Sequence, residues 1–299
     1  MNSLDRKSSG ISISLGRPTT LFAIVFAVTM CAGAGPVWAQ DRYDDHESKD
    51  RFYITIGGFS QTDLRTTIRL DAKSQTGGIA IGTLIGLESL FDLDDQVTTA
   101  RLDGWYRFGK KHRIDWTYWK TGREGVSTYN GEEPIEIGDD HLINPGDFVA
   151  TEDKSQLIAG SWSYSFLNTK KYELWLGAGL NFQRVDMTID VNLGDVTEEF
   201  QEQAKGTVPI PTLNFGLRWN FNQRWRMLVM QQLFGLDVGD FSGKLENTRV
   251  LAEFDITSHF GIGGGFERFN FEVNAESDEF VGELDTSYTA FTLFLKGQI

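Results

Sequence analysis

Polar and apolar side chains alternate along most of this chain. Five stretches show the alternation, and each is interrupted near its middle by a short turn flanked with aromatic residues. In the clearest stretch, one set of alternate positions is mostly apolar and the other mostly charged: Leu102, Gly104, Tyr106 and Phe108 against Arg101, Asp103, Trp105 and Arg107. A period of two places successive side chains on opposite faces of a β-strand. Such a sheet fits a barrel with lipid outside and water inside.

The alternation predicts ten strands. They cover 52–72, 97–108, 112–121, 155–166, 172–190, 207–221, 224–236, 244–256, 259–273 and 281–299. An even number of antiparallel strands is typical of membrane-spanning barrels. The predicted fold is therefore an all-β, transmembrane, antiparallel up-and-down β-barrel of about ten strands, with eight or twelve as alternatives.

The predicted connections alternate in length. Those at 109–111, 167–171, 222–223 and 257–258 are tight, whereas 73–96, 122–154, 191–206 and 274–280 are longer. Short turns on the periplasmic side and long loops outside are characteristic of outer-membrane barrels. We therefore expect the tight turns to face the periplasm.

Aromatic residues recur beside the tight turns, at positions predicted to point outward. They are Tyr106, Phe108, Tyr164, Phe166, Tyr172, Trp219, Phe221, Trp225, Phe254 and Phe260. Amphipathic rings prefer the headgroup zone of a bilayer. We interpret these residues as a periplasmic aromatic girdle. The alternative, aromatic residues in the core of a soluble sandwich, does not explain why they gather at one end of each strand.

The opposite face carries ionisable side chains. The predicted inward set is Arg101, Asp103, Arg107, Arg113, Asp115, Arg218, Arg249, Glu253, Asp255 and Glu267. Unpaired charges are costly in a dry core. In a narrow barrel they can form one network of ion pairs, which would largely plug the lumen. We expect this network to contribute rigidity or to set conductance.

Two segments, 179–187 and 263–271, share a pattern in which the apolar positions change parity at an arginine, Arg184 or Arg268. Either a β-bulge lies there, or the strands leave the bilayer and the polarity rule ends. Glycines are expected to face inward and to leave room for large luminal side chains. These glycines stand at 177, 179, 261, 263 and 265.

The start of the chain is predicted to be an export signal, residues 1–39. Arg6, Lys7 and Arg17 precede an apolar run, and small residues before Gln40 fit a cleavage site. An uncleaved anchor is the alternative, but the run is shorter than the roughly 20 residues of a spanning helix. Residues 40–50 are predicted to be a disordered periplasmic lead-in, and 51–299 the barrel domain.

Without residues 1–39 the chain has 25 basic and 41 acidic residues, a formal charge of −16. This balance argues against nucleic acid as a partner. The single cysteine, Cys31, lies in the predicted signal, so no cysteine nucleophile or metal ligand would remain. No cofactor, metal site or catalytic residue is assigned.

The chain resembles the small outer-membrane β-barrels of diderm bacteria, which include OmpA-like and OmpW-like barrels, and more narrowly an uncharacterised family of such proteins. The likeness covers about 50–299 and is carried by Gly82-Thr83, Leu87-Glu88, 101–108 and 112–115. The resemblance implies a barrel in the outer membrane and implies no activity. Lipid, lipopolysaccharide and the barrel-assembly machinery are the expected partners of a monomer.

The sequence favours a non-enzymatic structural or surface-interaction role in the cell envelope. The first alternative is a narrow passive channel for ions or small solutes. The second is an outer-membrane hydrolase. An omptin-like site could be built from Asp94, Asp95, Asp139, Asp140 and His141, while a lipid-modifying site would need His112 or His259 beside a serine.

The loops 122–154 and 191–206 are acidic and could bind divalent cations. The carboxylates concerned are Glu132, Glu133, Glu136, Asp139, Asp140, Asp195, Glu198, Glu199 and Glu202.

Overall fold

The computed structural model describes residues 51–72, 85–130, 134–137, 141–192, 199–276 and 280–299. Ten strands of this described part form the barrel wall. They are β1 (Phe52–Ala72), β3 (Val97–Phe108), β4 (His112–Thr128), β7 (Phe148–Asn168), β8 (Tyr172–Asn192), β9 (Glu199–Asn220), β10 (Trp225–Val238), β11 (Phe241–Asp255), β12 (Phe260–Glu276) and β13 (Phe280–Gln298). The predicted signal and lead-in lie outside the described residues.

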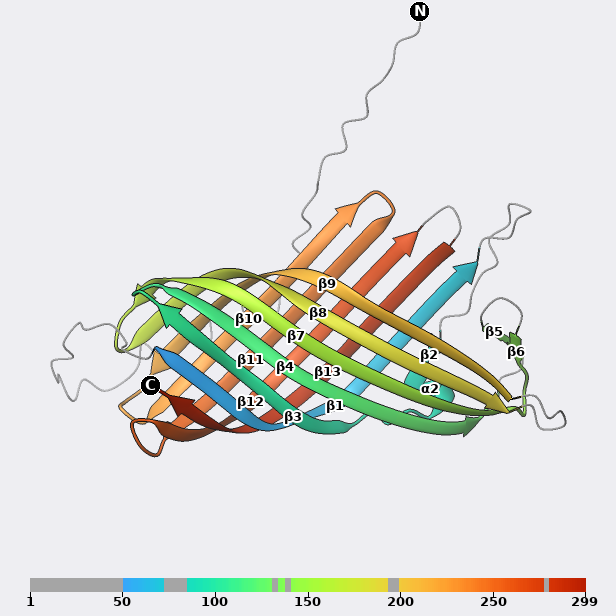
Figure 1. Cartoon of the computed structure of the whole chain (residues 1–299), viewed down its shortest axis with the longest axis horizontal. Coiled ribbons are helices and arrows are strands. Elements are labelled where there is room, and N and C mark those ends of the chain that lie inside the picture. Colours follow the sequence, from blue (N-terminus) through green and yellow to red (C-terminus); the bar gives the residue numbers. More distant parts are fainter. Residues whose placement is uncertain (1–50, 73–84, 131–133, 138–140, 193–198, 277–279) are drawn as a thin grey trace, which may run out of the picture.

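Each strand pairs antiparallel with its neighbours along the chain, and β13 pairs with β1 to close the wall. This confirms the predicted ten-stranded up-and-down barrel. The four turns at 109–111, 169–171, 221–224 and 256–259 lie at one end, together with the C-terminus (Figure 1). We name this the tight-turn end and the opposite one the loop end.

Several strands extend further toward the loop end than predicted. Residues 122–128 and 148–154 belong to β4 and β7, although they were predicted to be loop. Likewise β8 continues to Asn192 and β9 starts at Glu199. Several of their outward side chains are charged or polar, such as Glu124 and Lys154, which is typical of loops, although Val126 and Phe148 are exposed as well. The backbone pairing continues without interruption.

The predicted alternation of short and long connections breaks at one place. At the loop end, β10 and β11 are joined by the two residues Gly239 and Asp240. Gly239 has a φ of 60°, which glycine adopts without strain and which a tight hairpin turn requires. This hairpin is shorter than its neighbours, because β10 has 14 residues whereas β9 has 22.

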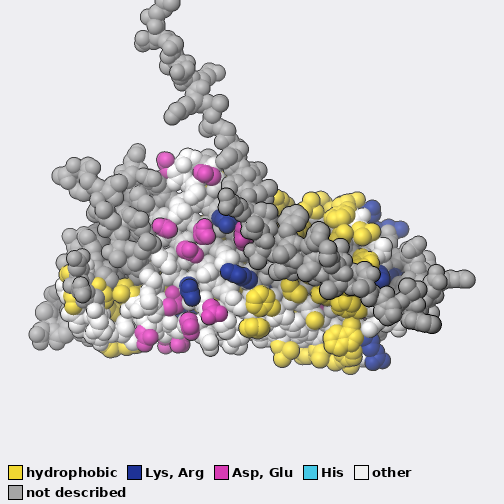
Figure 2. Space-filling model, turned by 180° about the vertical axis from the view of Figure 1, so that it is seen from behind, with side chains coloured by type: hydrophobic (Ala, Val, Ile, Leu, Met, Phe, Trp, Pro, Cys, Tyr) yellow, Lys and Arg dark blue, Asp and Glu magenta, His cyan; other side chains and the backbone are white. Residues whose placement is uncertain are grey.

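The barrel exterior has two halves of opposite character. Near the tight turns the outward side chains are apolar, as on β7, where Ile158, Trp162, Tyr164 and Phe166 are exposed. Beyond them on the same face follow Gln156, Lys154 and Glu152. Figure 2 shows apolar side chains over the tight-turn half and acidic ones over the other half. We name the apolar surface the belt.

The interior shows the reverse order. Charged side chains fill it at the level of the belt, whereas an apolar core fills it further toward the loop end. The buried members of this core are Phe59, Leu64, Trp119, Leu157, Ile210, Leu245, Phe269, Phe271, Tyr288 and Ala290. The loop half is therefore built like a soluble barrel, with most of its apolar side chains inside.

This inversion explains the parity change at Arg184 and Arg268. The register of both strands runs through these arginines without a shift, so the bulge predicted as one alternative is absent there. The second alternative was that the polarity rule ends there, and the apolar exterior does end at this level. A bulge does occur in β1, between Thr62 and Arg65, where Asp63 has a φ of 52°.

Some glycines in the wall, including the predicted Gly263, face the lumen opposite bulky side chains, whereas others such as Gly160 face outward. A Cβ on Gly263 would lie 2.4 Å from the ring of Phe294, and one on Gly216 would lie 2.2 Å from the ring of Trp175. Large luminal side chains occupy the space that these glycines leave open.

Four short elements lie at the loop end (Figure 1). The strand β2 (Ile85–Gly86) pairs with β1 and leads into the helix α2 (Leu87–Phe91). The strands β5 (Ile135–Ile137) and β6 (His141–Ile143) form a separate hairpin.

Candidate functional site in the barrel lumen

The lumen of the belt half contains three clusters of charged side chains. The first surrounds Glu173, on β8 beside a tight turn, whose side chain has no exposed surface. Its carboxylate contacts Arg107 at 2.5 Å, Arg218 at 2.9 Å and Arg113 at 3.6 Å. The Ser165 hydroxyl donates to it at 2.6 Å. One carboxylate therefore partly neutralises three guanidinium groups from three other strands, and we name this the Glu173 cluster.

Aromatic rings support the Glu173 cluster. The guanidinium carbon of Arg113 lies 4.2 Å from the ring centroid of Trp175 and 5.4 Å from that of Trp105. Arg113 also pairs with Asp115 at 2.8 Å. Guanidinium groups stack well on indole faces, so these rings stabilise the cation where water is excluded.

The second cluster surrounds Glu253 on β11, which is also fully buried. The Lys296 ammonium lies 2.9 Å from its carboxylate, and the Tyr53 hydroxyl donates to it. Lys296 also pairs with Asp255, which in turn contacts Arg226 at 2.5 Å. We name this the Glu253 cluster. The stacked rings of Tyr53 and Trp105, with centroids 5.5 Å apart, join it to the Glu173 cluster.

The third cluster lies deeper and joins strands from opposite sides of the wall. Arg249 forms two hydrogen bonds of 3.1 Å to Asp103, and Arg101 contacts Asp103 at 3.0 Å. Both arginines also reach Glu267, at 2.7 and 3.0 Å. We name this the Asp103 cluster. Its ion pairs connect β3 with β11 and β12 across the lumen.

All ten charged residues predicted to face inward are placed in the lumen, within these clusters or beside them. Sequence reasoning missed Glu173, Arg226 and Lys296. Parity alone could have found Lys296, because it stands between the outward residues Leu295 and Gly297 of the last strand. Glu173 lies directly after a tight turn, where the start of the strand alternation is hardest to judge. The role of the network in rigidity or conductance stays a prediction.

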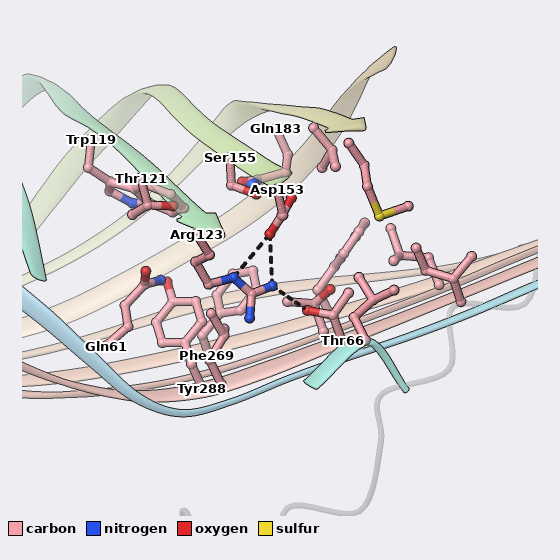
Figure 3. Close-up of a pocket in the computed structure, with 18 residues that line it drawn as sticks. Gln61, Thr66, Trp119, Thr121, Arg123, Asp153, Ser155, Gln183, Phe269 and Tyr288 are labelled. Atoms are coloured by element: carbon pink, nitrogen blue, oxygen red, sulfur yellow. Dashed lines mark hydrogen bonds and ion pairs between the residues drawn. The ribbon is translucent and has the colours of Figure 1, made fainter. Parts of the chain in front are cut away.

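Beyond the apolar core, a cavity of about 60 Å³ lies under the loop end. A cavity of this size holds several water molecules. Figure 3 shows Gln61 and Trp119 among its lining residues. The Gln61 side-chain oxygen and the Trp119 ring nitrogen are buried and make no hydrogen bond within the described part of the chain.

The helix α2 caps this cavity. Glu88 on α2 contacts Arg123 at 2.6 Å and accepts a hydrogen bond of 2.8 Å from the Thr66 amide. Arg123 also pairs with Asp153 at 2.7 Å (Figure 3). Leu87 and Phe91 are buried in a second apolar cluster with Val149, Ile189 and Val191 of the wall, among others. The described part of the first long connection, 85–96, therefore packs into the mouth of the barrel.

The predicted girdle residues all lie at the tight-turn end. Seven of the ten are exposed, and Tyr172, Trp219 and Phe254 are half-buried. The half-buried rings pack on neighbours, as Trp219 does on Phe221 with centroids 4.3 Å apart. Their function as a membrane girdle stays a prediction.

The residues proposed for hydrolase chemistry do not form a described site. Asp94 and Asp95 are exposed, and their backbone carbonyls accept hydrogen bonds from Arg123 and from the Leu64 amide. Asp139 and Asp140 lie outside the described residues, as does the side chain of His141. Within the described part, no group of three His, Cys, Asp or Glu side chains is placed to hold a metal ion.

His112 and His259 lie at the tight-turn end. His112 stacks on Phe108 and Trp162, with ring centroids 5.6 Å away in both cases. His259 lies 2.9 Å from the hydroxyl of its neighbour Ser258, in an exposed turn. His112 is thus packed among aromatic rings, and the Ser258–His259 pair belongs to the local structure of the turn. Of the acidic residues proposed to bind cations, none has a described side chain.

No protein-family model matches the chain, and no curated protein matches it in sequence. Several solved structures have a similar backbone trace. The outer-membrane protease OmpT from Escherichia coli is 11% identical, with a TM-score of 0.47, over 85% of this chain and 98% of that one. The attachment invasion locus protein Ail of Yersinia pestis is 9% identical, with a TM-score of 0.34, over 84% and 100%.

The translocator domain of the autotransporter NalP from Neisseria meningitidis is 8% identical, with a TM-score of 0.36, over 94% and 97%. These proteins have different roles, and at this level of similarity no role passes from them to this chain. Among the described residues, no helix is long and apolar enough to cross a membrane.

Proposed function

We propose that this protein is an integral outer-membrane barrel with a closed lumen. Its loop half extends beyond the bilayer and serves a structural or surface-interaction role. The observation that carries the proposal is the inversion of polarity along the barrel. The belt is apolar outside and charged inside. The loop half is mostly polar outside, with Val126 and Phe148 as exposed exceptions, and mostly apolar inside, with Arg123 and Asp153 as a buried ion pair.

The height of the belt supports insertion in a bilayer. On β7 the outward apolar residues run over 158–166, and on β13 over 291–299. A tilted membrane strand needs about 9–11 residues, which matches these segments. The whole strands are longer, 21 residues for β7 and 22 for β9. About half of each long strand therefore extends past the apolar zone.

The closed lumen supports a non-conducting role. The Glu173, Glu253 and Asp103 clusters cross the interior, and Glu173, Glu253 and Glu267 have almost no surface open to water. Moving such side chains aside would leave buried charges without partners, which costs several kcal/mol for each ion. Further toward the loop end, the apolar core and α2 also block the interior.

Planar-bilayer recordings and liposome swelling test the closed lumen. We expect no steps in current and no uptake of small sugars while circular dichroism reports a folded barrel. The positive control is the same preparation with an added porin, which must conduct. Reproducible single-channel steps from the protein alone would favour the narrow channel instead.

Cysteine labelling tests membrane insertion and its direction. The predicted mature chain has no cysteine. Lys205→Cys would place a thiol on the exposed loop half, and Lys170→Cys would place one at the tight-turn end. In intact cells of a diderm host, an impermeant maleimide should label only the first variant, and both should react after permeabilisation. Labelling of Lys170→Cys alone, or protein that dissolves without detergent, would contradict the proposal.

A further inference from the structure

The tight-turn end carries a rim of basic side chains. Its six members are all exposed: Arg51, Lys110, Lys111, Lys170, Lys171 and Arg224. The four turns at this end contain no aspartate or glutamate. The whole chain has a formal charge of −14, so this positive rim contrasts with the rest of the molecule. Figure 2 shows basic side chains at this end, directly beside the apolar belt.

The rim lies against the aromatic residues at the edge of the belt. The Lys111 ammonium is 5.7 Å from the ring centroid of Tyr164, and the Lys171 ammonium is 5.5 Å from that of Tyr172. Both tyrosines face outward. Rings of this kind lie at the headgroup level of a bilayer, and the lysines beside them would lie at the same depth.

We propose that this basic rim binds the phosphodiester headgroups of anionic phospholipids in the leaflet next to the tight turns. The inference rests on the proposed membrane insertion. Ammonium groups at headgroup depth attract phosphate, and each is worth about a fivefold gain near an anionic surface. The rim thus recruits a shell of anionic lipid around the tight-turn end and holds the barrel at a fixed depth.

The headgroups have one competitor in the chain itself. The segment 41–50, directly before Arg51, contains five acidic and two basic residues. It could neutralise the rim in place of lipid. We favour the lipid because the rim follows the wall from β1 to β10, whereas the segment is attached at a single point beside β1.

Tryptophan quenching by brominated lipids tests the proposal. The full chain is refolded into phosphatidylcholine vesicles with phosphatidylglycerol as a minority component, and either lipid carries the bromine. Trp162 and Trp225 are exposed on the belt near the rim and report on adjacent lipid. We expect brominated phosphatidylglycerol to be preferred by at least about fivefold over phosphatidylcholine, and salt to weaken the preference.

The test variant replaces the four rim lysines: K110Q, K111Q, K170Q and K171Q. The matched control has the same loss of charge on the loop half: K120Q, K154Q, K205Q and K244Q. The rim variant should lose the preference, the control should retain it, and arginine at the four rim positions should restore it.

An equal preference in the rim variant and the control would overturn the inference while leaving membrane insertion intact. A preference that arises only after the acidic residues of 41–50 are replaced would also overturn it, because that segment would then cover the rim. Failure to insert into either type of vesicle would instead refute the proposed function, and the inference with it.

Discussion

The substitution Glu173→Gln tests whether the luminal ion pairs hold the barrel together. It keeps the size of the side chain but removes the charge that Arg107, Arg113 and Arg218 share. The glutamine amide group would also direct N–H donors at groups that can only donate. Three guanidinium groups would then lie together in a site with no exposed surface at its centre.

The expected cost follows from this burial. Breaking a buried ion pair by removing one partner typically costs 3–5 kcal/mol, because the remaining charge is uncompensated. We expect the free energy of unfolding to fall by about this amount. With a urea dependence of about 1–3 kcal/mol per molar, the midpoint would move by at least about 1 M.

Urea unfolding in vesicles measures this change, with tryptophan fluorescence and heat-modifiable gel mobility as two independent signals. The matched control is Glu152→Gln, which removes the partner of Lys154 from an exposed pair on the outer wall. Such pairs contribute little, so the control should unfold like the unmodified protein. Equal midpoints for Glu173→Gln and the control would refute the view that buried ion pairs stabilise the wall.

Three further substitutions test other parts of the barrel. Arg107→Glu reverses a charge beside Glu173 and should weaken folding in detergent; unchanged heat-modifiable gel mobility would contradict this. Glu88→Ala removes the ion pair that holds α2, so amide hydrogen exchange should rise over 87–93 and stay constant in β8; uniform exchange would show that α2 is held by apolar contacts alone. Gly216→Val places a side chain against the Trp175 ring and should cost about 1–3 kcal/mol, as measured by urea unfolding. Trp175→Ala should restore part of this loss in the double variant, and additive losses would argue against a direct clash.

The sequence by itself determined the fold class and the orientation of most side chains in the belt half. The alternation of residue types is strong there because one face of each strand meets apolar surroundings and the other meets charges. Apolar and charged residues therefore repeat with a period of two. Arg101, Asp103 and Arg107 could be placed inside the barrel on this basis, and Tyr106 and Phe108 outside.

The same rule failed where the surroundings change. Past the belt, residues such as Glu124 and Glu152 point outward and resemble loop residues, so strands were predicted to end too early. The short β10–β11 turn was missed because the alternation of apolar and polar residues in these two strands also weakens past the belt. Backbone pairing, which residue type does not report, continues through both places.

Only the tertiary structure decided which charges meet. Glu173 meets Arg218 because the two residues are register partners on β8 and β9. It meets Arg107 of β3 because the wall curves around the lumen. Closure also brings β1 against β13 and folds α2 into the mouth. Alternation tells which face a side chain occupies, but its height and partners depend on strand register and tilt, which arise only when all ten strands pair.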